Sequence, residues 1–111
     1  DVAGKWNVRA VPESGDTSAT TYVLTATGTT SGWTITFPGR PPMAVKVSTD
    51  GDSIMMNAGP YASVRRKGQQ VTTNGVMRMQ GGNLVGTTVA HYAVKTADSV
   101  LILRTEGTRA K

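Results

Sequence analysis

The chain of 111 residues is long enough for one domain and too short for two. It contains no cysteine, which excludes disulfides and thiol chemistry, and no apolar stretch reaches the about 18 residues that a membrane-spanning helix needs. Its net charge of +5 favours acidic neighbours: membrane headgroups, nucleic acid or an acidic protein surface.

Alternation of apolar and polar residues predicts strands from the beginning of the chain. Residues 5–11 place Trp6, Val8 and Ala10 on one face and polar side chains on the other. A polar loop over 12–19 follows. The same alternation recurs in two further segments, residues 21–27 and 33–37. We therefore expect three strands before the first proline-rich turn.

Turn residues in the middle of the chain predict a hairpin. The prolines of 38–42 end the third strand, because proline removes a ladder donor, and a fourth strand is predicted to begin at Met43 and include Val47. Asp50-Gly51 predicts a type I′ turn into a return strand over 53–57, and Gly59-Pro60 predicts a bulge or bend.

Three more strands complete the pattern, over 71–80, 84–92 and 99–104, with 105–109 as an extension of the last. No segment has a sustained helical period. About eight short strands with short links predict a single all-β domain, 1–111, folded as an antiparallel up-and-down barrel. A two-sheet β-sandwich is the alternative architecture.

The two ends of the chain resemble those of a known group of barrels. Gly4-x-Trp6 on the first strand, with a basic residue late in the last, is similar to the lipocalin, fatty-acid-binding and avidin families. That resemblance implies that Trp6 plugs one barrel end beneath Arg104 or Arg109, held by a cation–π contact.

A second resemblance concerns the turns at 37–42, 50–53 and 105–109, which look like those of small exported bacterial β-domains. One setting for such a barrel is an extra periplasmic subunit of a photosynthetic reaction-centre and light-harvesting complex. The high threonine and glycine content also favours an exported protein. The start at Asp1 without methionine is consistent with a processed mature form or with a trimmed sequence. We expect it to be periplasmic or peripheral to a membrane.

Some apolar residues occupy alternate strand positions that are predicted to face outward. Together they indicate a surface that binds a partner. They belong to the last three strands and are Val76, Val85, Val89, Leu101 and Leu103. The one basic run, Arg65, Arg66 and Lys67, is expected to steer the chain to an acidic surface. Two alternatives remain open: loops 12–19 or 38–42 cover this face, or the register slips by one residue.

A carrier of a small apolar ligand is the alternative function. An eight-stranded barrel is just wide enough for packed side chains or one small molecule. The residues expected to line such a hollow are Trp33, Phe37, Met56 and Met77.

Catalytic and metal-binding patterns are lacking. His91 is the only histidine, which excludes a histidine-based metal cluster or catalytic triad within the chain. The few carboxylates lie at predicted turns or strand ends. Nucleic-acid binding is disfavoured because Trp6, Trp33 and Phe37 fall on the inward parity. The sequence therefore predicts a non-enzymatic accessory subunit without a cofactor or metal, docked on protein subunits of a larger, membrane-bound complex.

Overall fold

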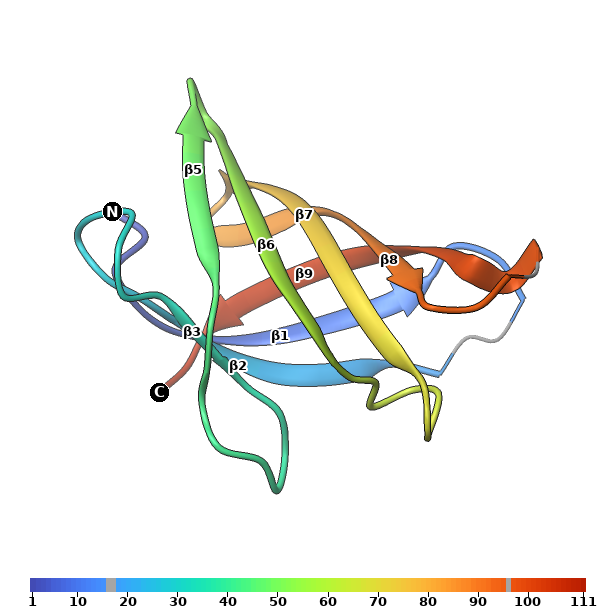
Figure 1. Ribbon diagram of the computed structural model, residues 1–111. Coiled ribbons are helices and arrows are strands. Elements are labelled where there is room, and N and C mark those ends of the chain that lie inside the picture. Colours follow the sequence, from blue (N-terminus) through green and yellow to red (C-terminus); the bar gives the residue numbers. More distant parts are fainter. Residues whose placement is uncertain (16–17, 96) are drawn as a thin grey trace.

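The computed structural model describes residues 1–15, 18–95 and 97–111, and shows a nearly closed antiparallel barrel (Figure 1). Part of the predicted loop 12–19 therefore lies outside the described residues. The strands are β1 (Gly4–Pro12), β2 (Thr20–Ala26), β3 (Thr34–Thr36), β4 (Met43–Ala44), β5 (Lys46–Asp50), β6 (Ser53–Ala62), β7 (Gln70–Gln80), β8 (Asn83–Tyr92) and β9 (Val100–Arg109). A 3₁₀ turn, η1 (Ala97–Ser99), precedes β9.

The nine strands of the described chain form one sheet in the order β4-β3-β2-β1-β9-β8-β7-β6-β5. Consecutive strands pair with each other except β4 and β5, which form the two edges of the sheet, and β1 pairs with β9 to join the chain ends. The predicted barrel is confirmed and the sandwich is excluded, because all the strands belong to a single sheet.

The predicted fourth strand is divided at Val45. Before that residue β4 pairs with β3, and after it β5 pairs with β6, while the Val45 N–H donates a hydrogen bond of 3.0 Å to the Trp33 carbonyl. The segment 43–50 therefore contributes a strand to each edge of the sheet, β4 to one edge and β5 to the other. This division explains why the described residues form nine strands, whereas alternation predicts about eight.

The larger of two core clusters in the described chain contains Trp6, near the start of β1. Trp6, Leu24, Met77 and Leu84 are the largest fully buried side chains. A second cluster lies farther along the barrel and consists of Ala10, Val71, Ala90, Tyr92 and Leu103. The inward parity predicted for the first strand is confirmed by the burial of its alternate residues.

The structure corrects the turn predicted at Asp50-Gly51. The two central residues are Gly51 and Asp52, since Asp50 pairs with Ser53, and only Gly51 has a positive φ, of 59°. This is the pattern of a type II′ turn. The condition for type I′, positive φ at both central residues, is met instead at Gly81-Gly82 between β7 and β8.

The parity predicted for the last strand is wrong by one residue. Leu103 is buried and Leu101 packs against the second core cluster, whereas Val100 and Ile102 point outward with 49% and 43% of their surface exposed. Four consecutive apolar residues carry no alternation, so their sequence does not show which two face the core. The inward set continues at Thr105, whose hydroxyl lies 2.8 Å from that of Thr88.

Gly86 lets the β7–β8 hairpin curve around the barrel. It lies opposite Met77 on the inward face, and a Cβ atom there would stand 1.9 Å from the Val76 carbonyl oxygen. No side chain fits so close to a backbone atom. Gly75, on the neighbouring strand, has more room, because its nearest neighbour would be the Thr88 hydroxyl at 3.5 Å.

We expect Gly86→Ala to lower the free energy of unfolding by about 2–4 kcal/mol, because the β7 backbone has to move away from the methyl group. Gly75→Ala, the matched control, is expected to change it by less than about 1 kcal/mol. Urea unfolding followed by tryptophan fluorescence measures both. Equal effects for the two variants would show that Gly86 is not the tight point of the hairpin.

Candidate functional site

Trp6 and Arg109 close one end of the barrel. The Arg109 Cζ lies 4.2 Å from the centre of the Trp6 ring, and Trp6 is fully buried. The guanidinium also donates a hydrogen bond of 2.6 Å to the Ala3 carbonyl and a second one to the Asp1 carbonyl. Gly4 leaves room for it, because a Cβ there would lie 2.9 Å from the guanidinium.

The barrel-end contact expected from the family resemblance is therefore present, with Arg109 as the partner of Trp6. Arg104 takes no part in it. Its position on β9 is opposite Val11 near the other end of β1, and its side chain is exposed.

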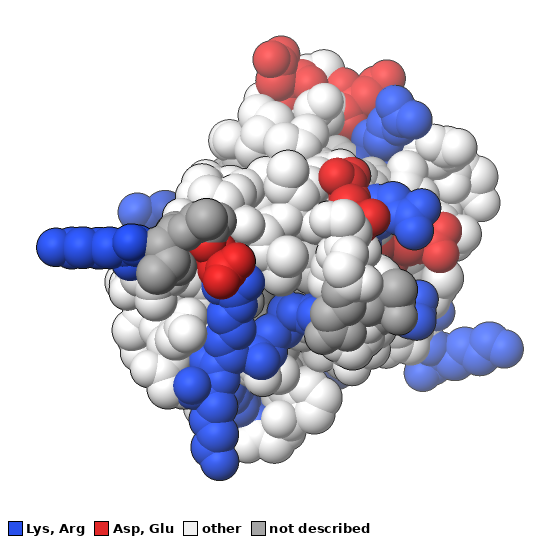
Figure 2. All heavy atoms as spheres, turned by 90° about the vertical axis from the view of Figure 1, so that its right-hand side faces the viewer, with Lys and Arg blue, Asp and Glu red and all other residues white. Residues whose placement is uncertain are grey.

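Three arginines connect the loops at the opposite, open end. Arg65 donates hydrogen bonds to the Ser18 carbonyl at 2.8 Å and the Thr20 hydroxyl at 2.9 Å. Arg66 lies over the Tyr92 ring at 4.0 Å and donates to the Asp98 carbonyl. Arg40 donates to the carbonyls of residues 62 and 63. Figure 2 looks onto this end and shows Lys and Arg side chains gathered across its lower part.

The residues of the predicted basic run, 65–67, therefore differ in their roles. The Arg65 and Arg66 side chains are half-buried and hold loops together, whereas Lys67 is exposed. The run therefore has a structural role that its sequence does not reveal.

A small hollow lies inside the barrel beneath these loops. Its volume is about 60 Å³, and all three tyrosines of the chain, Tyr22, Tyr61 and Tyr92, line it together with Thr88. A still smaller space of about 30 Å³ continues toward Met56. About 10–15 Å³ is needed for each water molecule, so the hollow has room for only a few.

The tyrosine side chains form part of an aromatic cluster. The Phe37 ring centre lies 5.5 Å from that of Tyr22 and 5.5 Å from that of Tyr61. Burial raises the pKa of both the Tyr22 and the Tyr61 hydroxyl above the ordinary value, the Tyr22 pKa also through the nearby Tyr61. Both hydroxyls therefore stay protonated well into the alkaline range.

Only half of the residues predicted to line a ligand hollow do so. Phe37 and Met56 border the two spaces. Met77 is packed in the core, and the buried Trp33 donates a hydrogen bond of 2.7 Å to the Thr29 carbonyl. Alternation did place Tyr22 and Tyr92 inward, but nothing in the sequence showed that the tyrosines meet.

The outer face of β7, β8 and β9 carries an apolar patch. Three of the five exposed large hydrophobic residues in the described chain, Val76, Val100 and Ile102, lie on it. Val89 is half-buried and pairs directly with Ile102, and Val85 lies on the same face of β8. Of the five apolar residues predicted here, Leu101 and Leu103 face the core instead, for the reason given above.

Exposed charges border this patch, here called the β7–β9 patch. Arg104 is on the same face of β9 as Ile102, and Arg78 lies opposite Val85. Arg9, on β1, is opposite Glu106. Three cations and one anion therefore surround the apolar side chains.

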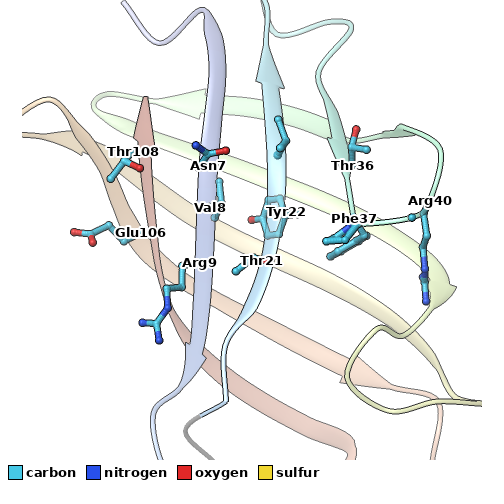
Figure 3. Close-up of a pocket in the computed structure, with 13 residues that line it drawn as sticks. Asn7, Val8, Arg9, Thr21, Tyr22, Thr36, Phe37, Arg40, Glu106 and Thr108 are labelled. Carbon is cyan, nitrogen blue, oxygen red and sulfur yellow. The ribbon is translucent and has the colours of Figure 1, made fainter. Parts of the chain in front are cut away.

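An open trough with both polar and apolar lining adjoins the patch on the other side of β9. Its lining comes from β9, β1, β2 and β3, and the 38–40 loop forms one wall (Figure 3). The inward-facing Val8, Tyr22 and Phe37 contribute to its floor. The trough is open to solvent and has a volume of about 770 Å³. Its outward polar residues are Asn7, Arg9, Thr21, Thr36, Glu106 and Thr108, and the outward apolar residue Val23 lies among them. Sequence reasoning missed it, because polar residues on an outer face carry no signal of concavity.

Comparisons of the chain with protein-family models, curated proteins and solved structures found no significant match. Among residues 1–15, 18–95 and 97–111, no cluster of three or more His, Cys, Asp or Glu side chains is arranged to hold a metal. None of the helical segments in the described chain has the length and apolarity to cross a membrane. The candidate sites are thus the outer patch with its trough and the inner hollow.

The raised tyrosine pKa values predict a loss of stability in alkali. Unfolding lets both hydroxyls ionise near their ordinary pKa of about 10, whereas the folded state resists ionisation. The free energy of unfolding is therefore unaffected by ionisation of these hydroxyls below about pH 10. Above it, the free energy of unfolding falls as pH rises, by up to about 1.4 kcal/mol per pH unit for each tyrosine.

Urea unfolding at about pH 8 and about pH 11 tests this, with Tyr22→Phe as the variant that lacks one ionisable hydroxyl. We expect Tyr22→Phe to lose less stability than the wild type between the two pH values. An identical loss in both proteins would contradict the assignment of the effect to Tyr22.

Proposed function

We propose that the protein is a non-enzymatic accessory subunit that docks through the β7–β9 patch onto protein subunits of a larger, membrane-bound complex. The observation that carries this proposal is the gathering of three of the five exposed large hydrophobic residues on one outer face. Singly scattered apolar side chains need no explanation, but neighbouring ones on one face favour a partner.

The charges around the patch favour an acidic partner surface. Arg78, Arg104 and Arg9 border the apolar side chains and outnumber Glu106. Such a rim raises the rate of encounter with an acidic surface and makes it sensitive to salt. The steering role predicted for Arg65 and Arg66 is better supplied by these arginines, because the former two hold loops; Lys67 remains exposed and is able to contribute.

The setting that we propose is the periplasmic side of a bacterial membrane. Its support is the composition of the chain and the resemblance of three turns to those of small exported β-domains. The same resemblance makes a photosynthetic reaction-centre and light-harvesting complex the first assembly to test.

Replacing two outward residues of β9, Val100→Ser with Ile102→Ser, is expected to release the partner while the barrel stays folded. Both side chains are about half exposed, so their replacement should change the stability of the barrel little. It should remove much of the binding energy of the interface. The measurement is recovery of partner subunits with the tagged chain from native membranes in mild detergent, with circular dichroism as the test of folding.

The matched control is Val64→Ser, because Val64 is 44% exposed but lies at the open end, away from the patch. We expect this variant to retain the partner at the wild-type ratio. Undiminished recovery with the folded double variant would reject the β7–β9 patch as the docking surface.

A second candidate function is ligand binding in the inner hollow, favoured by the convergence of three tyrosine side chains beneath Arg65. The volume of about 60 Å³ limits it to a molecule of a few non-hydrogen atoms, since common ligand sites occupy about 300–1,000 Å³. A lipocalin-like carrier of fatty-acid size is not favoured by this volume.

We therefore expect no saturable one-to-one binding of the fluorescent probe 1-anilinonaphthalene-8-sulfonate to the folded chain. Ala90→Leu is the informative variant, because Ala90 is buried at the wall of the hollow and a larger side chain fills it. Saturable binding that Ala90→Leu abolishes would favour the carrier function over docking.

A further inference from the structure

β5 is an unpaired edge of an otherwise nearly closed sheet. It stands last in the strand order and pairs only with β6. Outside the strand ladders, no backbone hydrogen bond in the described chain involves Lys46–Asp50. In Figure 1 the β5–β6 hairpin rises above the rest of the barrel, with β5 on its outer side. Such an edge is a template on which another strand pairs.

The hairpin register shows which backbone groups are free. A two-residue turn makes Asp50 and Ser53 a hydrogen-bonded pair, and such pairs alternate along an antiparallel ladder. Lys46, Ser48 and Asp50 therefore direct their N–H and C=O groups toward β6. Val47 and Thr49 direct theirs to the open edge, which leaves two donors and two acceptors without a strand partner.

The free edge is complementary to itself. If two copies of β5 meet antiparallel with Ser48 on the twofold axis, Val47 lies opposite Thr49 of the second copy. All four free groups of each copy then form hydrogen bonds. In the same register Lys46 lies opposite Asp50 of the second copy, and the symmetry repeats this ion pair.

The side chains suit this register as well as the backbone does. Lys46, Ser48 and Asp50 are all exposed and share the outward face, whereas Val47 packs partly against the core. Their pairs are the ones without hydrogen bonds, in which opposite side chains come closest. The edge has no net charge, so the charge of +5 on the whole chain does not concentrate there.

We propose that the β5 edge pairs with β5 of a second copy, forming a twofold-symmetric dimer with one continuous sheet. The inference goes beyond the docking function, since β6 separates β5 from the β7–β9 patch. A five-residue edge buries less than the about 1,200 Å² of a standard interface, so the dimer forms in a concentration-dependent way.

Sedimentation velocity from about 10 µM to about 1 mM protein tests the dimer. We expect reversible dimerisation in the wild type. Lys46→Asp places a negative charge opposite Asp50 of the second copy, at both symmetry-related positions. It should therefore raise the dissociation constant of the dimer by about tenfold or more. Lys46→Asp combined with Asp50→Lys restores both ion pairs and should restore dimerisation. Lys67→Asp is the control, with the same change in net charge at another exposed lysine.

The register has its own test, because the chain contains no cysteine. Two Ser48→Cys side chains would face each other across the axis at a Cα separation of about 4.5 Å, within the range for a disulfide. We expect rapid oxidation to a covalent dimer, and slow oxidation for Asp52→Cys in the nearby turn. Monomers at every concentration would overturn the proposal and show that the edge charges prevent association. A dimer that Lys46→Asp leaves unchanged would also overturn it, because the two copies would then associate through another surface.

Discussion

The antiparallel pairing of β1 with β9 is the constraint on which the rest of the structure depends. It joins the two ends of the chain through a register that runs from Trp6 opposite Arg109 to Pro12 opposite Leu103. Closing so long a loop has an entropic cost, but that cost grows only slowly with length. The register brings Arg109 over the Trp6 ring, and it sets Arg9 beside Glu106 on the outer face. Barrel closure and the outer surface thus follow from the same set of hydrogen bonds.

The two ends of the barrel differ in how they are filled. Large apolar side chains pack around Trp6 at one end, whereas tyrosine and threonine side chains surround a small hollow at the other. Loops above that hollow are connected by Arg40, Arg65 and Arg66, which donate hydrogen bonds across the opening. The interior is therefore nearly full, and the outer surface is the part of the molecule with most capacity to bind a partner.

The charged residues divide into those that stabilise the barrel and those that are available to a partner. Arg109 and Arg66 each lie over an aromatic ring, and Arg65 donates hydrogen bonds to Ser18 and Thr20, so their charges are committed to the fold. Arg78 and Arg104 lie on the outer face beside exposed valine and isoleucine side chains. A partner that meets this face encounters apolar surface with a positive rim, while the β5 edge presents one lysine and one aspartate with no net charge. These two surfaces therefore differ in chemistry.

Period-two alternation by itself determined the all-β class, most of the strand segments and the inward residues of the first strands, because one buried face imposes its pattern on each strand. The resemblance of the chain ends to those of known barrel families implied that Trp6 closes one barrel end, and Arg109 lies over its ring at 4.2 Å. Tertiary structure decided the rest. Val100 to Leu103 are all apolar, so only pairing with β8 showed that Leu103 faces the core and Ile102 faces solvent. Likewise, the division of one strand at Val45, the meeting of three tyrosines and the free edge of β5 depend on how distant strands pair. Local alternation cannot encode those relations, because it records which face a residue occupies and not which residue lies opposite it.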